Sequence, residues 1–433
     1  MRDPKNNLFI KLSKVQSLKS PFLVIAVGAL ALFLLFGIHA TILKHPDSES
    51  YSSFARDLSS GEIFSRVPAP WYSVVRTPGF PALLAVFQTL FGENPVALFL
   101  LHSVLALLVL AAAIFRFKNF VSQWVILLLT LLAFWLWRDY YAVILTEWSA
   151  LCVLLLFLCF TPQNYKECSP LRLFSIGLIL SLLVLIKPAL ITCLAVVALF
   201  VCFAVRREDR RRISVGILLG LLPLFFWCTF NSYRLGSFGV ASFKGHNAFG
   251  VASLIGSAKF DISDGPDIMR FSNYVNLLKF PQEGQEATVV VDQLPDIYFA
   301  LPTRFNFNVY QVALQFEKER NYPRQAYDDL MCRYSKRVIL ENPLSYFKFV
   351  LSGLNTLLRD AWFLVISILL LVLLINSGHP LSLFLGAALG LHLSHVLLCS
   401  LIQIVNSRYY LLTFIPLGFA TVLAMLAVVR VRR

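Results

Sequence analysis

The sequence contains few charged residues. Only 14% of its 433 residues are Asp, Glu, Lys or Arg, whereas 58% are hydrophobic. A water-soluble domain has about 25% charged residues. This deficit excludes an ordinary soluble enzyme and predicts a protein that lies largely within a membrane.

Acidic residues are especially scarce, with 24 Asp and Glu against 38 Lys and Arg, and the net charge is +14. Nearly all of the excess, 17 basic against 4 acidic residues, falls in five segments: 1–20, 115–120, 161–172, 206–212 and 430–433. The rest of the chain, with 21 basic and 20 acidic residues, nets only +1. Because Lys and Arg gather on the cytoplasmic side of membrane proteins, we assign these segments and both termini to the cytoplasm. The placement gives no reason to expect nucleic acid as a partner.

Metal-binding and disulfide patterns are also missing. The eight cysteines include no Cys-X-X-Cys pair, so neither a zinc site nor a disulfide framework is indicated. His392 and His395 are too few for a zinc site, and we interpret them as polar packing within a span. The sequence indicates no cofactor and leaves a divalent metal requirement open.

Long apolar runs are what the chain has in abundance. A membrane-spanning helix needs roughly 20 apolar residues, fewer when it is buried among other helices. The first run, after a basic start, is too long for a signal peptide, and we interpret it as a retained span. Ten spans are predicted, which return the chain to the side where it began: 21–43, 96–114, 121–137, 145–160, 173–186, 189–205, 213–230, 361–376, 380–402 and 409–429.

The predicted fold class is therefore an all-α polytopic membrane protein, with surface helices and a small domain on the outer side. We divide it into three parts. Residues 1–230 form a transmembrane core that includes a first outer loop, 44–95. Residues 231–345 form an outer domain, and residues 346–433 form a C-terminal surface helix and the last spans.

The first outer loop predicts a helix that begins at Asp47. Its apolar residues are spaced at i, i+3, i+4 and i+7, and Gly61 can end it: Tyr51, Phe54, Ala55 and Leu58. Such a stripe favours a helix that lies along the membrane surface. A rigid turn, residues 76–81, and a short apolar segment, 82–91, follow it.

The outer domain is harder to interpret because it shows no clear periodicity. It contains 12 basic and 12 acidic residues. Residues 289–291, three valines, predict a strand. Residues 334–358 predict helix with a break at Asn342-Pro343, and 344–358 favours another surface helix.

Acidic residues in the outer stretches are candidates for catalysis. Asp47 lies just outside the first span, where a carboxylate can act as general base for an incoming hydroxyl. The same position suits an N-cap, which is the alternative role. Glu49 points to another side of the helix and is interpreted as a helper or a solvated acid. For Asp139 and Glu147, beside the fourth span, a structural ion pair is the alternative to a role in the site.

Basic residues near the outer ends of spans are candidates for binding a phosphate. Lys187-Pro188 interrupts the apolar stretch 173–205, which also fits a simple hairpin turn. The other candidates are equally explained as interfacial anchors: Arg76, Arg138, Arg234, Lys244, His246 and Arg408.

The order of several short motifs resembles the GT-C superfamily of membrane glycosyltransferases. The likeness is to bacterial relatives of the dolichyl-phosphate-mannose protein mannosyltransferases and to the aminoarabinose transferase of lipid A. Each motif is short, and their common order along the chain carries the resemblance: Asp47-Ser48-Glu49-Ser50-Tyr51, Arg76-Thr77-Pro78-Gly79-Phe80-Pro81, Leu90-Phe91-Gly92, Leu145-Thr146-Glu147, Lys187-Pro188, Asn231-Ser232-Tyr233-Arg234-Leu235-Gly236, Asn342-Pro343-Leu344 and Ser407-Arg408-Tyr409.

The resemblance implies a polyprenyl-phosphate sugar donor, an active site on the outer face and inversion at the anomeric carbon. Carried over, Asp47 looks like the catalytic base, and the resemblance extends to Glu147 and Lys187 as further site residues. Together with our own candidates, the predicted second acidic groups are Glu49, Asp139 and Glu147, and the predicted phosphate-binding residues are Arg76, Arg138, Lys187, Arg234 and Arg408. The sequence departs from the family where an Asp-Glu pair is replaced by Asp-Ser-Glu, which puts the role of Glu49 in doubt. It departs again at Asn231-Ser232-Tyr233, where the family has Arg-Asn-Tyr.

The function predicted from the sequence is transfer of a sugar from that donor to a hydroxyl of a lipid, glycan or protein acceptor. The protein would be integral to the bacterial inner (plasma) membrane, with membrane lipids as further partners. One alternative is a lipid-linked sugar transporter or flippase, for which repeats and mid-span ionisable residues are expected. The other is a polysaccharide ligase or polymerase, for which His246 is a candidate.

Overall fold

The computed structural model describes residues 20–37, 42–43, 45, 47–65, 69–162, 168–203, 205–242, 244–278, 312, 316, 324–402 and 407–431. Over these ranges the chain is helices and connecting turns, with one isolated β-bridge between Leu43 and Val143. The all-α polytopic membrane class predicted from the sequence is confirmed. The strand predicted at 289–291 lies outside the described residues.

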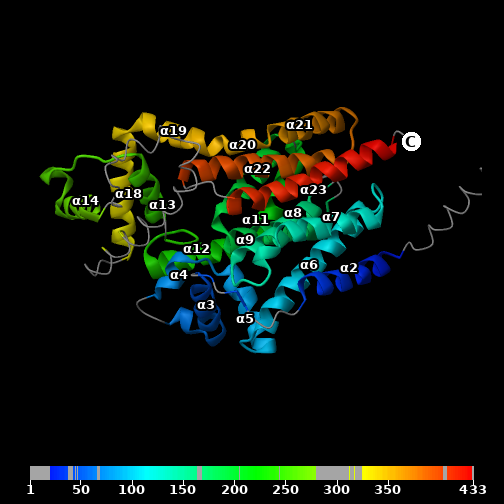
Figure 1. Cartoon of the computed structure of the whole chain (residues 1–433), viewed down its shortest axis with the longest axis horizontal. Coiled ribbons are helices and arrows are strands. Elements are labelled where there is room, and N and C mark those ends of the chain that lie inside the picture. Colours follow the sequence, from blue (N-terminus) through cyan, green and yellow to red (C-terminus); the bar gives the residue numbers. More distant parts are fainter. Residues whose placement is uncertain are drawn as a thin grey trace, which may run out of the picture.

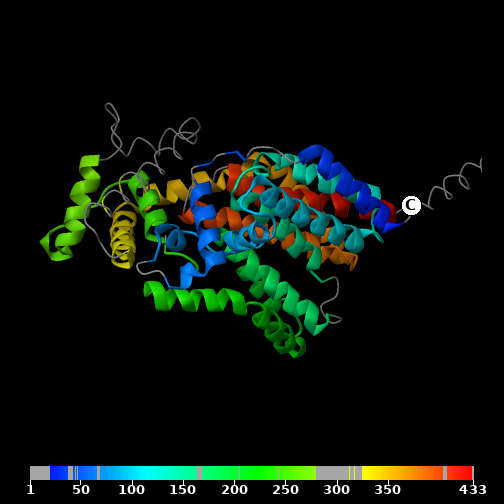
Figure 2. The same cartoon turned by 90° about the horizontal axis from the view of Figure 1, so that it is seen from below.

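The main body is a bundle of apolar helices that run roughly side by side along the long axis of the molecule (Figure 1). Its members are α2 (Pro21–Phe36), α6 (Pro95–Phe117), α7 (Gln123–Leu136), α8 (Thr146–Phe160), α9 (Pro170–Ile186), α21 (Ala361–Asn376), α22 (Ser382–Ile402) and α23 (Ser407–Val431). The helix α10 (Thr192–Phe203) packs against α22, and α11 (Arg207–Gly220) and α12 (Leu222–Leu235) pack against α9. In Figure 2, α11 and α12 stand out from the side of the bundle.

Within the described ranges, α6, α22 and α23 are each long and apolar enough to cross a membrane. Two bent pairs bring the number of candidate spans to five, and several shorter apolar helices accompany them. The helices fall where the sequence predicts spans. The count of ten crossings stays a prediction.

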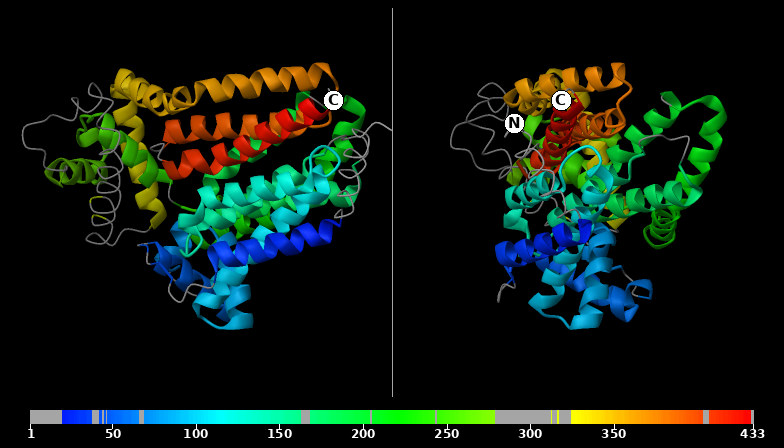
Figure 3. Two further views of the ribbon diagram at one scale, coloured as in Figure 1. Left: turned by 45° about the vertical axis from the view of Figure 1, so that its right-hand side comes forward. Right: turned by 90° about the vertical axis from the view of Figure 1, so that its right-hand side faces the viewer.

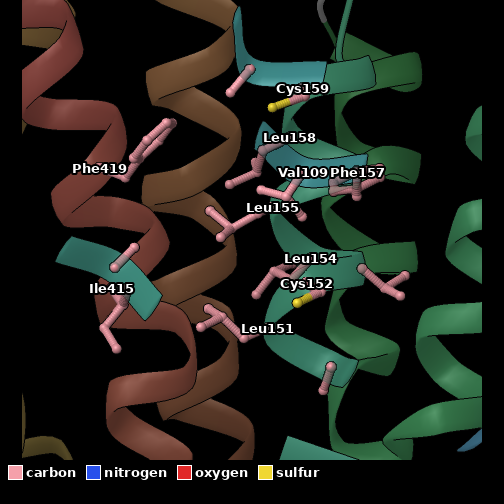
Figure 4. Close-up of a cluster of buried hydrophobic side chains, with 14 of the residues drawn as sticks. Val109, Leu151, Cys152, Leu154, Leu155, Phe157, Leu158, Cys159, Ile415 and Phe419 are labelled. Atoms are coloured by element: carbon pink, nitrogen blue, oxygen red, sulfur yellow. The ribbon is translucent and has the colours of Figure 1, made fainter. Parts of the chain in front are cut away.

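The helix α8 forms the centre of the bundle. Thirteen of its fifteen residues are buried, as expected for a helix that is apolar on every side. From Leu151 to Cys159 it packs among α6, α23 and its other neighbours, and Figure 4 labels buried residues of these three helices: Val109, Leu151, Cys152, Leu154, Leu155, Phe157, Leu158, Cys159, Ile415 and Phe419. A central helix that is fixed on all sides holds its first turn in a defined place.

Two predicted spans differ from the structure. The run 21–43 is helical only to Phe36, because Gly37 adopts a φ of 55°, which ends the helix. The run 213–230 is two helices, α11 and α12, bent by 54° at Leu221. Pro223 at the start of α12 has no backbone N–H to donate to the preceding turn, which explains the break.

The helix predicted within 44–95 is present: α3 (Ser48–Ser60) ends at Gly61, whose φ is 77°. The interpretation of its apolar stripe as a membrane-surface face is wrong. The stripe is buried in the protein, with Tyr51 against Phe80 and Phe54 against Trp227. The chain continues through η2 (Glu62–Phe64), α4 (Trp71–Val75) and α5 (Gly79–Phe91).

The helices α13 (Lys244–Ile255), α14 (Pro266–Leu278) and α18 (Arg324–Glu341) lie at one end of the molecule (Figure 3), with η6 (Ile262–Asp264) between the first two. Their apolar side chains form a second buried cluster. As predicted, Asn342 and Pro343 separate α18 from α19 (Pro343–Leu354), which is followed by α20 (Thr356–Arg359). The division of the chain into three domains stays a prediction.

The crossing of α9 and α11 depends on glycines. A Cβ atom added at Gly177 would lie 2.1 Å from the carbonyl oxygen of Ile217, and one at Gly220 would lie 2.2 Å from that of Phe174. Gly216 and Gly220 form a Gly-X-X-X-Gly pattern, which lets helices approach closely in membranes.

We therefore predict that Gly177→Ala lowers the stability of the protein in detergent by about 1–3 kcal/mol, because the methyl group forces the two helices apart. Gly418→Ala is the matched control. Nothing lies within 4 Å of a Cβ atom at Gly418, and Ala is the better helix former. Equal melting temperatures for the Gly177 and Gly418 variants would contradict this account of the crossing.

Candidate functional site

The candidate site is built around a carboxylate in the first turn of α8. Glu147 is only 2% exposed, and its Oε1 atom accepts a hydrogen bond of 2.8 Å from Nζ of Lys187. The same Oε1 lies 3.1 Å from Nε of Arg408, which forms a second ion pair. The positive end of the α8 dipole also favours a negative charge at this place.

Lys187 reaches Glu147 because the chain turns sharply after α9. The helix ends at Ile186, and η5 (Pro188–Ile191) begins directly after Lys187. A Cβ atom at Gly79 would lie 2.6 Å from the backbone nitrogen of Ile186, so only glycine lets α5 pack against this turn. The predicted turn at Lys187-Pro188 is thus present, and it places the ammonium group inside the protein.

Arg408 comes from the first turn of α23, more than 200 residues along the chain from Lys187. The ring of Tyr409 joins the two cations, with its centroid 4.8 Å from Nζ of Lys187 and 5.4 Å from the guanidinium of Arg408. The face of an aromatic ring attracts a cation, so the ring of Tyr409 stabilises both positive charges. The side chain of Arg408 is 27% exposed, whereas that of Lys187 is 7% exposed.

A third ion pair joins Asp47 and Arg76. The Nη2 atom of Arg76 donates to Oδ1 of Asp47, and its Nε donates to Oγ of Ser50 over 3.2 Å. The guanidinium also lies 5.0 Å from the ring centroid of Tyr51. Asp47 and two residues of α3 therefore hold Arg76. The carboxylate of Asp47, 24% exposed, makes no capping hydrogen bond to α3, so its side chain does not act as the N-cap considered from the sequence.

Tyr51 links the ion pairs electrostatically. Its phenol interacts with Arg76, Glu147, Asp47 and Arg408, so members of all three pairs lie near one side chain. Burial raises the pKa of Tyr51 to about 12, with Arg76 opposing that rise. The hydroxyl of Tyr51 therefore stays protonated at neutral pH. We call the five charged residues around it the charged cluster: Asp47, Arg76, Glu147, Lys187 and Arg408.

The charged cluster has three cations and two carboxylates, so it carries one excess positive charge. Glu147 partners two of the cations and is buried away from solvent. Arg408 and Asp47 are its most exposed members. The partly exposed guanidinium of Arg408 can bind an anion, and the partly exposed carboxylate of Asp47 can accept a proton from a second group.

Other residues predicted for the site have different surroundings. Arg138 and Asp139 lie on the short η3 helix (Arg138–Tyr140), where both side chains are largely exposed and pair with each other at 3.9 Å. Arg234 donates to Ser73 and lies over an aromatic ring of α12, so it anchors α12 to α4. Glu49 is exposed in the first turn of α3.

His392 and His395 make buried polar contacts within the bundle. Nδ1 of His392 lies 3.0 Å from the hydroxyl of Thr413, and Nδ1 of His395 lies 3.2 Å from the carbonyl of Ala189. His246, the candidate for a ligase, is fully buried beside Asp328 at 3.5 Å. In the described part of the chain, no group of three or more His, Cys, Asp or Glu residues could hold a metal ion.

Two tyrosines that contact the charged cluster, Tyr51 and Tyr409, were not predicted from the sequence as site residues. Tyr51 was interpreted only as part of an apolar stripe, and Tyr409 only as part of a motif. The available signal was the adjacency of Tyr409 to Arg408, and the four-residue spacing of Tyr51 from Asp47, which brings both to one side of a helix.

No protein-family model and no curated protein matches the chain. Two solved structures are similar to it, both of ArnT from Cupriavidus metallidurans. The structure bound to undecaprenyl phosphate has 13% sequence identity and a TM-score of 0.41, and the match covers 94% of this chain and 77% of that one. The apo structure has 11% identity and a TM-score of 0.38, over 92% and 77% of the two chains. ArnT is the lipid A aminoarabinose transferase, one of the GT-C proteins whose motifs the sequence resembles.

We predict strong energetic coupling between Glu147 and Lys187. Glu147→Gln leaves Lys187 buried beside a neutral partner, and breaking a buried pair costs about 3–5 kcal/mol of stability. Lys187→Met added to Glu147→Gln removes that uncompensated charge. A double-mutant cycle, measured by unfolding in detergent, should therefore give a coupling of about 1–3 kcal/mol.

The exposed pair Arg138 and Asp139 provides the control cycle, with Arg138→Met and Asp139→Asn. Its coupling should be close to zero, because water screens exposed ion pairs. Additive effects at Glu147 and Lys187 would show that their pairing does not hold the cluster together.

Proposed function

We propose that the protein is a glycosyltransferase that moves a sugar from a polyprenyl-phosphate donor to a hydroxyl of a lipid, glycan or protein. One observation carries the proposal. Five charged residues from five separate segments form three ion pairs near Tyr51, with one excess positive charge. The order of the sequence motifs supports the same class of enzyme.

The cationic side of the cluster suits the phosphate of the donor. Arginine offers a planar set of donors that matches phosphate oxygens, and Arg408 has the most exposed cationic side chain of the cluster. The ammonium group of Lys187 is hydrogen-bonded to Glu147, so Lys187 holds the Glu147 carboxylate in place, and Glu147 in turn holds Arg408. During transfer the bond between the anomeric carbon and the phosphate oxygen breaks, and the cations stabilise the negative charge that develops on that oxygen.

The acidic side of the cluster supplies the base. The acceptor oxygen forms a bond to the anomeric carbon, and its proton passes to the carboxylate of Asp47. Glu147 does not fit this role, because its Oε1 atom already contacts two cations and the residue is buried. A single displacement with one general base inverts the configuration at the anomeric carbon.

We further propose that this chemistry takes place on the outer face, because the segments with excess positive charge are assigned to the cytoplasm. Asn273 is exposed on α14 and Arg207 begins α11. We expect Asn273→Cys to react with a membrane-impermeant maleimide in intact cells and Arg207→Cys to react only after lysis. The opposite pattern would place the charged cluster on the cytoplasmic face.

Arg408→Gln is expected to weaken binding of a polyprenyl phosphate by about 1.5–3 kcal/mol, because it removes charge-assisted hydrogen bonds to the phosphate. The measurement is the dissociation constant of the purified protein for polyprenyl phosphate in detergent. Lys259, which is exposed after α13, provides the control: Lys259→Gln should bind polyprenyl phosphate with unchanged affinity. Unchanged affinity in Arg408→Gln would remove this residue from the phosphate site.

Asp47→Asn keeps the size of the side chain and removes the basic carboxylate. We expect the rate of sugar transfer to fall by on the order of 10²–10⁴-fold, with binding of polyprenyl phosphate largely kept. Glu49→Gln, two residues away and exposed, should be nearly neutral. A near wild-type transfer rate for Asp47→Asn would show that Asp47 is not the base.

A further inference from the structure

The helix α19 has two unlike faces. One face is sealed against the bundle: a Cβ atom at Gly353 would lie 2.5 Å from Oγ of Ser400, and the hydroxyl of Tyr346 donates to the carbonyl of Leu401 over 2.9 Å. Phe349 and Val350 are buried on the same side. Contacts of this kind fix both the position and the rotation of α19.

The opposite face is a stripe of large apolar side chains at a spacing of three and four residues. Leu344 is 66% exposed, Phe347 is 57% exposed and Leu351 is 42% exposed. The stripe continues into α20, where Leu358 is 69% exposed. An exposed stripe of this kind marks a surface that faces an apolar environment.

The neighbouring span shows what that environment is. After Arg359 the chain bends by 71° into α21, an apolar helix of 16 residues, and α19–α20 together with α21 are long and apolar enough for one broken membrane segment. Trp362, at the bend, is 65% exposed, and Val365 and Leu369 continue the exposed apolar surface along α21. The stripe of α19 is thus continuous with a surface that faces lipid, and tryptophan is enriched where hydrocarbon meets headgroups. A helix at 71° to a span lies nearly in the plane of the membrane.

We infer that α19 and α20 lie in the interface of the bilayer, with the stripe of Leu344, Phe347, Leu351 and Leu358 inserted among the lipid chains. The occupant of this face is the lipid of the same membrane that α21 enters. Arg359, exposed beside Leu358, stands where it can meet lipid phosphates.

This placement sets the depth of the charged cluster, a consequence that rests on the proposed function. Asp360 at the bend accepts a hydrogen bond of 2.7 Å from the hydroxyl of Tyr410, two residues after Arg408. The interfacial helix therefore holds the start of α23 at the level of the headgroups. A polyprenyl phosphate carries its phosphate at that same level, so the donor meets Arg408 without leaving the bilayer.

The experiment is site-directed spin labelling of the full-length protein in vesicles of phosphatidylethanolamine and phosphatidylglycerol. Phe347→Cys is labelled in a background with Cys202→Ser and Cys332→Ser, and Leu344→Cys is a second reporter should the first variant fail to fold. We expect the label at either position to collide more often with oxygen than with a water-soluble nickel complex. Asn273→Cys on α14 is the control and should show the reverse.

A label at Phe347 or Leu344 that collides mainly with the nickel complex would place the stripe in water and overturn the inference. Low collision rates with both reagents would mean that protein covers the stripe, which overturns it equally. Neither result depends on sugar transfer. Failure of the lipid contact therefore leaves the proposed function standing, and failure of the Asp47 test leaves the lipid contact standing.

Discussion

The contact between Glu147 and Lys187 is the interaction on which the rest of the site depends. Both side chains are buried, and a buried charge is tolerated only when a partner of opposite sign satisfies it. The pair joins the first turn of α8 to the turn after α9, and Arg408 adds the first turn of α23 through the same oxygen atom. Three chain segments far apart in the sequence are thereby fixed at one end of the bundle.

The remaining geometry follows from that anchor. α8 is buried on nearly every side, so the position of Glu147 is set by the packing of the whole bundle. Gly79 lets α5 approach the turn at Lys187, and Arg76, three residues earlier, then meets Asp47 and the ring of Tyr51. Glu147 is occupied by cations and Asp47 is partly exposed, so environment separates the roles of two residues of the same chemical kind. This division of roles is the physical basis of the proposed chemistry.

Much of the fold could be predicted from the sequence because its signals are local. Apolar runs located the bundle helices, the spacing of Tyr51, Phe54 and Leu58 located α3, and Asn342-Pro343 located the break before α19. The end of α2 at Gly37 and the bend at Leu221 were missed, because a run of apolar residues does not reveal where a helix stops within it. Hydropathy indicates which residues are buried in lipid or protein. The end of a helix depends instead on the backbone conformation of single residues.

The site was predicted only in part, because pairing depends on contacts between distant segments. Sequence analysis named all five members of the charged cluster, but it could not join Glu147 to Lys187, which lie 40 residues apart. Arg138 and Arg234 looked equivalent to Arg408 in the sequence. In the structure Arg138 is exposed on a turn, and Arg234 holds α4 in place. Residue type and distance from a span do not distinguish a residue of the site from an anchor.

The most direct test of the central claim is an experimental structure of the protein with a polyprenyl phosphate bound. We expect the phosphate oxygens within hydrogen-bond distance of the Arg408 guanidinium, with Glu147 and Lys187 still paired behind it. We also expect the carboxylate of Asp47 to face the position that the sugar would occupy. A phosphate bound away from Arg408, or a bound state in which Asp47 faces away from the phosphate, would contradict the account.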